Sequence, residues 1–177
     1  MSEPSIHVTR LQAAVTSVER MLEDYARSRS RTGLRHDLPA AQVSGLGEAL
    51  PGSAFDALGE WFALTPFEQA IVALAAGFEI SPDMANLCAL AQGDPAVTYP
   101  TTLLALAVFA DLQGASQAVF APSAPLRHWQ LIQVEGARPG SRLQLRFAMP
   151  DAVLSFLVGQ PVLDDALADL VRPLDLA

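Results

Sequence analysis

Residues that could carry out catalysis are few and widely separated in this chain. The three histidines are His7, His36 and His128, and their spacing matches no metal-binding motif, while Cys88 is the single cysteine. Zinc sites bring several His, Cys or carboxylate ligands together, which these residues do not provide in sequence. All 11 basic residues are Arg, so no lysine is present to form a Schiff base or to contact a nucleotide phosphate. We therefore expect no catalytic residue, no metal and no cofactor in this chain.

The remaining reactive side chains have structural interpretations that we favour. Cys88 lies in an apolar helical pattern and is expected to be a small core residue. Asp164 and Asp165 would complement the dipole at the start of a helix rather than form an acid/base pair. His128 is expected to make a structural hydrogen bond. Arg127 follows a Pro-Leu corner and would either contact carbonyls of the preceding turn, which we favour, or bind an acidic partner.

Charge is distributed unevenly. Residues 1–35 contain six Arg and four acidic residues, net +2, whereas residues 36–177 contain five Arg and fifteen acidic residues, net −10. Nucleic-acid binding relies on basic side chains that displace counterions, so most of this surface would repel DNA. The exception is the Arg-Ser alternation at residues 27–31. It could touch nucleic acid or an acidic protein, but we interpret it as a solvated connector.

Nothing in the sequence indicates a membrane or secreted protein. No apolar run approaches the roughly 18 to 20 residues that a membrane span requires. The first five residues, Met1-Ser2-Glu3-Pro4-Ser5, lack the basic and apolar regions of a signal peptide. We therefore expect a cytoplasmic protein without membrane contact.

Two domains are predicted from the periodicity. Residues 1–35 read as an amphipathic helix, from about residue 8 to residue 26, followed by an Arg/Ser linker that continues with little periodicity to residue 53. Residues 36–177 read as the second, winged-helix-like domain. One stripe of the first helix is apolar, and we expect it to lie on the domain or on a partner. Deleting residues 1–35 is expected to leave a folded domain.

The second domain is predicted to be mainly helical with one small β-hairpin. Ser53 would cap a helix that points Phe55, Leu58, Trp61 and Phe62 inward. Thr65-Pro66-Phe67-Glu68 forms a capping box, and Ser81-Pro82 and Tyr99-Pro100-Thr101 would begin the next two helices. Alternating residues at 142–147 predict a strand that pairs with residues 130–134 across a loop at 135–141. Short helices would begin at Pro150-Asp151 and cover residues 163–171.

Several of these segments resemble a known protein family. The sequences Trp61-Phe62-Ala63-Leu64-Thr65-Pro66-Phe67-Glu68, Tyr99-Pro100-Thr101, Ala124-Pro125-Leu126-Arg127-His128-Trp129-Gln130-Leu131, Phe156-Leu157-Val158-Gly159 and Leu163-Asp164-Asp165-Ala166-Leu167 are similar to the winged-helix region of bacterial and archaeal AAA-type ATPases. The similarity covers residues 55–171. The resemblance extends to members encoded with contractile, phage-tail-like injection particles.

The resemblance implies an ATPase module C-terminal to this chain, in a parent protein that would form a ring and bind ATP and Mg²⁺. This chain itself departs from the ATPase pattern. It contains no Gly-x-x-x-x-Gly-Lys-Ser/Thr loop and no hydrophobic strand ending in Asp-Glu to hold Mg²⁺. We therefore expect that it does not hydrolyse ATP.

Two functions remain open from the sequence. The first is a non-catalytic module of such an ATPase that recruits a protein partner, self-associates or positions the ring. The second is a winged-helix DNA-binding regulator, which we disfavour because the helix assigned to base reading, residues 101–111, offers only Thr101, Thr102 and Asp111. The candidate interaction surface consists of the helical stripe and the outer face of the wing: Leu11, Val15, Val18, Leu22, Arg138, Arg142 and Arg146.

Overall fold

The computed structural model describes residues 5–31, 46–135 and 145–160. In chain order the helices are α1 (Ile6–Arg31), α2 (Ala54–Trp61), α3 (Pro66–Ile80), α4 (Met84–Gln92), α5 (Thr102–Val108), the 3-10 helix η1 (Gln117–Phe120), α6 (Pro125–His128) and α7 (Asp151–Leu157). Strands β1 (Gln133–Glu135) and β2 (Arg146–Ala148) lie between α6 and α7. The predicted fold class is confirmed, since the described residues form a helical domain with one small antiparallel sheet.

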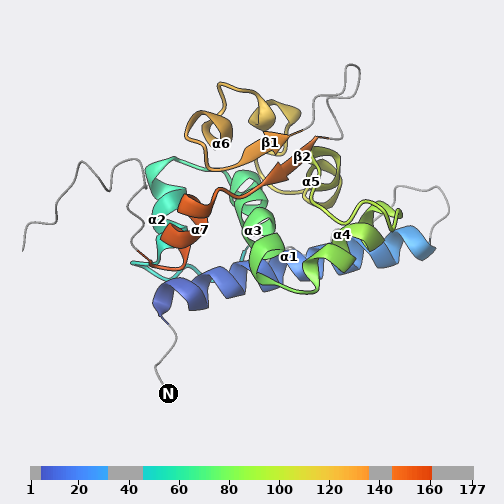
Figure 1. The fold of residues 1–177 in the computed structure, drawn as a ribbon, viewed down its shortest axis with the longest axis horizontal. Coiled ribbons are helices and arrows are strands. Elements are labelled where there is room, and N and C mark those ends of the chain that lie inside the picture. The colour runs from blue at the N-terminus through green and yellow to red at the C-terminus, as the bar shows by residue number, and fades with distance from the viewer. Residues whose placement is uncertain (1–4, 32–45, 136–144, 161–177) are drawn as a thin grey trace, which may run out of the picture.

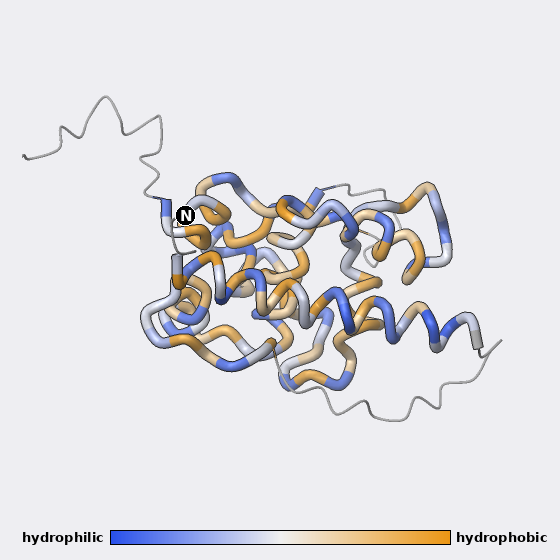
Figure 2. The backbone as a smooth tube through the Cα atoms, turned by 90° about the horizontal axis from the view of Figure 1, so that it is seen from below, coloured by the Kyte–Doolittle hydropathy of each residue, from blue (hydrophilic) through white to orange (hydrophobic). Residues whose placement is uncertain are grey.

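α1 runs along one side of the molecule and forms part of the core. It packs mainly against α4 and α3 and also contacts α2, α5 and α7 (Figure 1). Hydrophobic and hydrophilic stretches alternate along it, and its last turns are hydrophilic (Figure 2). Of the two positions left open for this helix, on the domain or on a partner, the structure has the first, and α1 belongs to the body. The predicted boundary between residues 35 and 36 lies outside the described residues.

Helix α3 passes through the centre of the domain because it is apolar on every side. Ten of its residues are buried. Its start is as predicted: Thr65 Oγ1 accepts from the Glu68 N–H, and the Glu68 carboxylate accepts from the Thr65 N–H. Its end differs from the prediction. Ser81 closes α3 and donates to Glu19 on α1, so it does not cap α4, whose N-cap is Asp83 without a side-chain bond.

The strands lie on the side of the molecule away from α1, next to α5 and α6 (Figure 1). Val134 faces Phe147 in the antiparallel register of β1 and β2. The other edge of β2 pairs with the start of α5, where the Thr102 N–H donates to Leu145 and the Phe147 N–H donates to Pro100. The predicted hairpin is confirmed, although β1 begins three residues later than expected. The intervening loop and the helix predicted at 163–171 lie outside the described residues.

Candidate functional site

The apolar stripe predicted as a docking surface is inside the protein. Leu11, Val15, Val18 and Leu22 are each at most 4% exposed and belong to the main core cluster. They lie on the helix that α3 and α4 cover. An interface needs accessible side chains, so these four residues offer no free surface in this fold. The predicted apolar stripe is confirmed, but α3 and α4 of the same chain cover it, not a partner protein.

Of the three wing arginines, only Arg146 lies in the described residues. It is exposed on β2, and its guanidinium carbon lies 5.3 Å from the centre of the Tyr99 ring. This cation–π contact holds the side chain along the surface. Arg138 and Arg142 lie outside the described residues.

The Arg-Ser run at residues 27–31 is helical in this structure, because α1 continues to Arg31. Arg27 pairs with Glu23 and Asp24 on the same helix face. Arg29 donates to the Ala91 carbonyl at 2.7 Å, at the end of α4. The two arginines are therefore engaged within the domain, and the expected irregular connector is wrong for residues 28–31.

Arg10 and Asp56 form the main buried polar contact between α1 and α2. Arg10 Nε lies 3.0 Å from both carboxylate oxygens of Asp56, and Arg10 Nη1 donates to the Leu46 carbonyl at 2.7 Å. Burial alone would raise the pKa of Asp56. Hydrogen bonds from Arg10, Ser53 and the Leu50 N–H, with the charge of Arg10, outweigh it and lower that pKa below its ordinary value. The pair fixes α2 against α1, and its charges neutralise each other.

Cys88 is a core residue, as predicted. Its side chain is fully buried on α4, and burial raises the pKa of the thiol to about 12. A protonated thiol is neither a nucleophile nor a metal ligand. Among residues 5–31, 46–135 and 145–160, no group of three or more His, Cys, Asp or Glu side chains is placed to hold a metal ion.

The helix immediately before the hairpin is α6, which the sequence analysis read as a corner. Pro125 occupies its first turn and Leu126 is fully buried beneath it. Arg127 donates to the Phe120 carbonyl at 3.1 Å, which confirms the structural role favoured for it. The position assigned to a base-reading helix, residues 101–111, was therefore wrong, since α5 is separated from β1 by η1 and α6.

An aromatic group lies exposed at the end of α6. Trp129 is 56% exposed, its ring centre lies 5.5 Å from that of Phe62, and the His128 ring stands edge-on at 4.8 Å. We call Phe62, His128 and Trp129 the α6 aromatic surface. This surface was not predicted from the sequence, because the segment before Arg127 was interpreted as a Pro-Leu corner. Phe62, expected inward, is half-buried and packs on the core as well as on Trp129.

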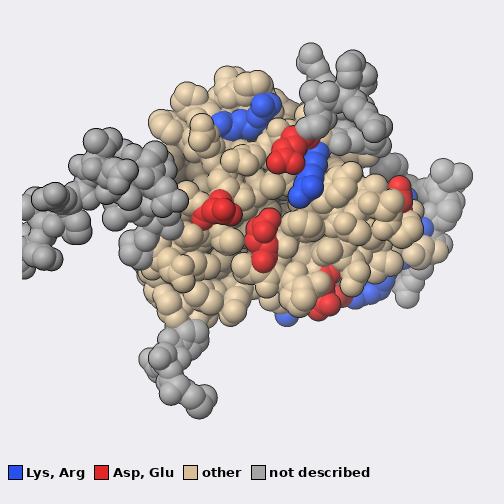
Figure 3. Space-filling model, in the orientation of Figure 1, with Lys and Arg blue, Asp and Glu red and all other residues tan. Residues whose placement is uncertain are grey.

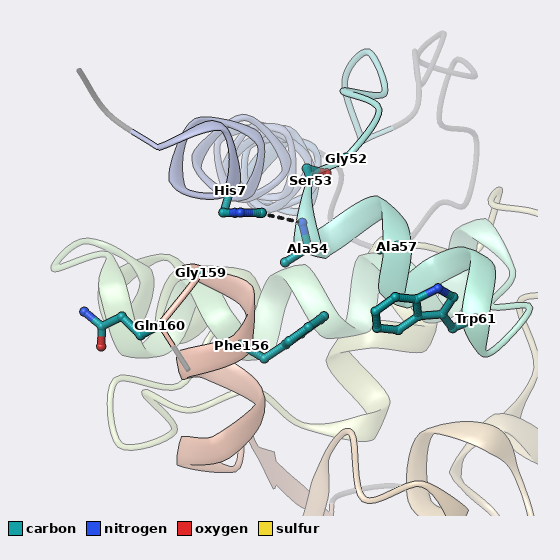
Figure 4. A pocket seen from close by; sticks show the side chains of 9 residues that line it. All are labelled: His7, Gly52, Ser53, Ala54, Ala57, Trp61, Phe156, Gly159 and Gln160. Carbon is teal, nitrogen blue, oxygen red and sulfur yellow. Dashed lines mark hydrogen bonds between the residues drawn. The ribbon is translucent and has the colours of Figure 1, made fainter. Parts of the chain in front are cut away.

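A pocket opens between α1, α2 and α7. Its volume is about 450 Å³, and nine residues line it: His7, Gly52, Ser53, Ala54, Ala57, Trp61, Phe156, Gly159 and Gln160 (Figure 4). His7 Nδ1 accepts from the Ala54 N–H at 3.0 Å. We call this the α7 pocket.

Trp61 and Phe156 form the apolar rim of the α7 pocket. Their ring centres are 5.7 Å apart. Trp61 is 68% exposed, so its predicted inward orientation is wrong. At about 100° per residue, Trp61 lies about 60° around α2 from Leu58 and about 120° from Phe55, at the edge of the buried face.

Charged side chains are sparse on the face that contains α2, α6 and α7. In Figure 3 most of this face is uncharged, and some of the few acidic and basic groups lie side by side. The chain between residues 125 and 149 nevertheless contains four of the five arginines of the body, Arg127, Arg138, Arg142 and Arg146, and a single acidic residue, Glu135. In sequence, this stretch is therefore net positive within an acidic protein.

Comparison with known proteins identifies the fold. A family profile described as winged helix domain, variant, matches residues 12–171, which includes most of α1. No curated protein and no solved structure gave a significant match. In the described parts of the chain, no helix is long and apolar enough to cross a membrane.

Proposed function

Since the chain belongs to the winged helix domain family in its variant form, we propose that it is a non-catalytic protein-interaction module, and that the α6 aromatic surface is its contact site. The observation that carries this proposal is the exposed ring of Trp129. This side chain is 56% exposed, packs against Phe62 and lies shortly before the hairpin. Trp is enriched among the residues that dominate protein interfaces, where a large rigid ring contributes much binding free energy.

The sequence of the hairpin indicates the charge of the partner. The hairpin arginines Arg138, Arg142 and Arg146 would attract an acidic protein segment, and Trp129 would pack against an apolar side chain of that segment. The resemblance of the sequence to AAA-type ATPases supports a more specific role, in which the module recruits the partner to an ATPase ring. In that role ATP and Mg²⁺ bind the parent's ATPase module and not this chain.

DNA binding is the second candidate, and the same arginines are the observation that favours it. Two features oppose it. A helix of four residues extends about 6 Å, too short to present several side chains to base edges, and Arg127 already donates to the Phe120 carbonyl. The side chain exposed at the end of α6 is the aromatic Trp129 rather than a basic residue.

Two binding measurements test the choice. We expect no mobility shift of nonspecific duplex DNA at micromolar protein and low salt, since nonspecific affinities are typically about 10⁻⁴ to 10⁻⁶ M. A salt-sensitive shift would favour the regulator.

In affinity capture from cells, a partner should be lost with Trp129→Ala and retained with Leu90→Ala, which removes an equally exposed apolar side chain on α4. Equal loss with both variants would contradict a specific α6 surface.

The ATPase association has its own tests. A phosphate-binding Gly-x-x-x-x-Gly-Lys-Ser/Thr motif encoded downstream of residue 177 would support it, and a continuous reading frame without that motif would oppose it. The present chain should show no rise in melting temperature with Mg-ATP, because it contains no phosphate-binding motif. A ligand that bound the native state tightly would raise the melting temperature by mass action. A rise of several degrees would contradict the proposed lack of a nucleotide site.

A further inference from the structure

The α7 pocket is open in the described residues although its wall is apolar. The indole of Trp61 and the ring of Phe156 meet at its rim, and Ala54 and Ala57 form its α2 side (Figure 4). Trp61 is 68% exposed. Burying such rings gives a large favourable free energy, so an apolar pocket with an exposed Trp is a binding site for another apolar group.

The chain leaves the last described helix at this pocket. The N–H groups of Gly159 and Gln160 donate to Phe156 and Ser155, the paired bonds that end a helix and turn the chain. Gly159 has a φ of +77°, and a Cβ there would meet the His7 ring at 2.5 Å. Both Gly159 and Gln160 line the pocket. Residues 161–177 therefore continue from its edge.

The sequence of that continuation matches the pocket in chemistry. Between residues 162 and 171 the apolar side chains recur at helical spacing: Val162, Leu163, Ala166, Leu167, Leu170 and Val171. Two residues separate Gln160 from Leu163, so three extended steps of the chain can reach about 10 Å. A tether this short gives an effective concentration in the millimolar range, far above that of a free partner. The family profile also extends to residue 171, so the domain includes this segment.

We propose that residues 163–171 bind in the α7 pocket as an amphipathic helix and cover Trp61 and Phe156. The pocket then belongs to the completed domain and is occupied from within the same chain. This inference does not rest on the proposed role of the α6 aromatic surface, and Trp129 stays exposed in either case.

The test uses the full chain with Trp129→Phe, so that Trp61 is the only tryptophan and its fluorescence can be followed alone. In this protein Trp61 should be poorly quenched by acrylamide. Leu167→Asp should raise its quenching constant towards that of free tryptophan and shift its emission to the red. Leu174→Asp, the same substitution outside residues 163–171, should change neither quantity. An unchanged Trp61 in the Leu167→Asp variant overturns the proposal.

Other occupants give distinct results. If a second copy covers Trp61, quenching rises on dilution of the protein; if an external partner is required, Trp61 is already quenched like free tryptophan in the purified chain. Either result overturns the proposal. A second measurement changes the pocket instead of the segment. Hydrogen exchange of amides 163–171 should become faster in Ala57→Glu, which alters the α2 side of the pocket, and stay unchanged in Ala96→Glu, an exposed loop site. Equal exchange in both variants also overturns it, even if Leu167→Asp fails to fold.

Discussion

Thr65 links a four-residue sequence signal to the position of the central helix. Its hydroxyl accepts from the Glu68 N–H and donates to the Glu68 carboxylate, while its own N–H donates to the same carboxylate at 2.9 Å. These bonds satisfy backbone groups at the start of α3 that have no partner within the helix. Because the signal is local, it was readable from sequence without knowledge of the tertiary fold.

Replacing this cap should weaken the fold measurably. Thr65→Ala removes the hydroxyl and should lower the free energy of unfolding by about 1 kcal/mol. Urea denaturation monitored by circular dichroism gives this quantity. Thr98→Ala is the control, because Thr98 is exposed in a loop and such changes stay within about 0.5 kcal/mol. Equal effects of the two substitutions would contradict the capping role.

The Arg10–Asp56 pair predicts a pH dependence. The pKa of Asp56 is lowered from its ordinary 3.8 in the folded protein. The contribution of the carboxylate to stability is therefore complete above pH 3.8 and is lost as the pH falls through the lower, folded-state pKa. Asp56→Ala should destabilise by about 3 kcal/mol at neutral pH, since it leaves a buried Arg10 without its counter-charge.

Unfolding free energies measured from pH 6 to pH 2 test the sign. The difference between the parent protein and Asp56→Ala should shrink as the pH falls below 3.8. A difference that grows on acidification would mean that the pKa of Asp56 is raised. Glu60→Ala, an exposed acid on the same helix, serves as the control for general charge effects.

At the scale of elements, sequence patterns predicted what local chemistry decides and missed what packing decides. The capping box, the Cys88 helix and the hairpin follow from spacing within a few residues. The helix α6 has four residues, fewer than periodicity can detect, and its one signal is Pro125 in its first turn. Trp61 was placed wrongly because its spacing of three residues from Leu58 does not show how wide the buried face of α2 is. The α7 pocket joins α1, α2 and α7, which no local pattern brings together.

The close approach of α1 and α4 to α3 at Gly77 could also not be predicted from the sequence. A Cβ on Gly77 would lie 2.5 Å from Met84 Cε and 3.0 Å from Val15 Cγ1, so α1 and α4 both approach α3 at this point. Met84 can move its flexible end, but Val15 is β-branched, stiff and buried. The contact with α1 therefore decides the effect of any larger residue.

Gly77→Ala should be destabilising despite the better helix propensity of Ala. Overpacking typically costs about 1 to 3 kcal/mol, against a propensity gain of about 1 kcal/mol. We expect a net loss, and a double variant with Val15→Ala should lose less than the sum of the two single changes, because the second removes the obstructing methyl groups. Denaturant unfolding of the four proteins measures this coupling. Additive losses would show that Val15 does not limit the space.

The whole molecule depends on α1 as a shared support. A separate helix was predicted because a stretch with little periodicity follows it, so nothing in the sequence tied its apolar stripe to the body. An apolar stripe by itself does not distinguish the helix of a core from the helix of an interface. The contacts with α2, α3, α4, α5 and α7 make the distinction, and the family profile begins within the same helix at residue 12.

Removal of α1 should therefore unfold the domain rather than release an arm. Leu11, Val15, Val18 and Leu22 are buried, and each fully buried side chain of this kind contributes about 1.5 to 3 kcal/mol. Their sum is comparable with the whole stability of a domain, about 5 to 15 kcal/mol, and their loss would also expose α3 and α4. Deleting residues 1–31 should abolish the cooperative thermal transition, whereas deleting residues 1–4 should leave it intact. A cooperative transition in the larger deletion, at a melting temperature close to that of the full chain, would show that α2 to α7 form a complete core without α1.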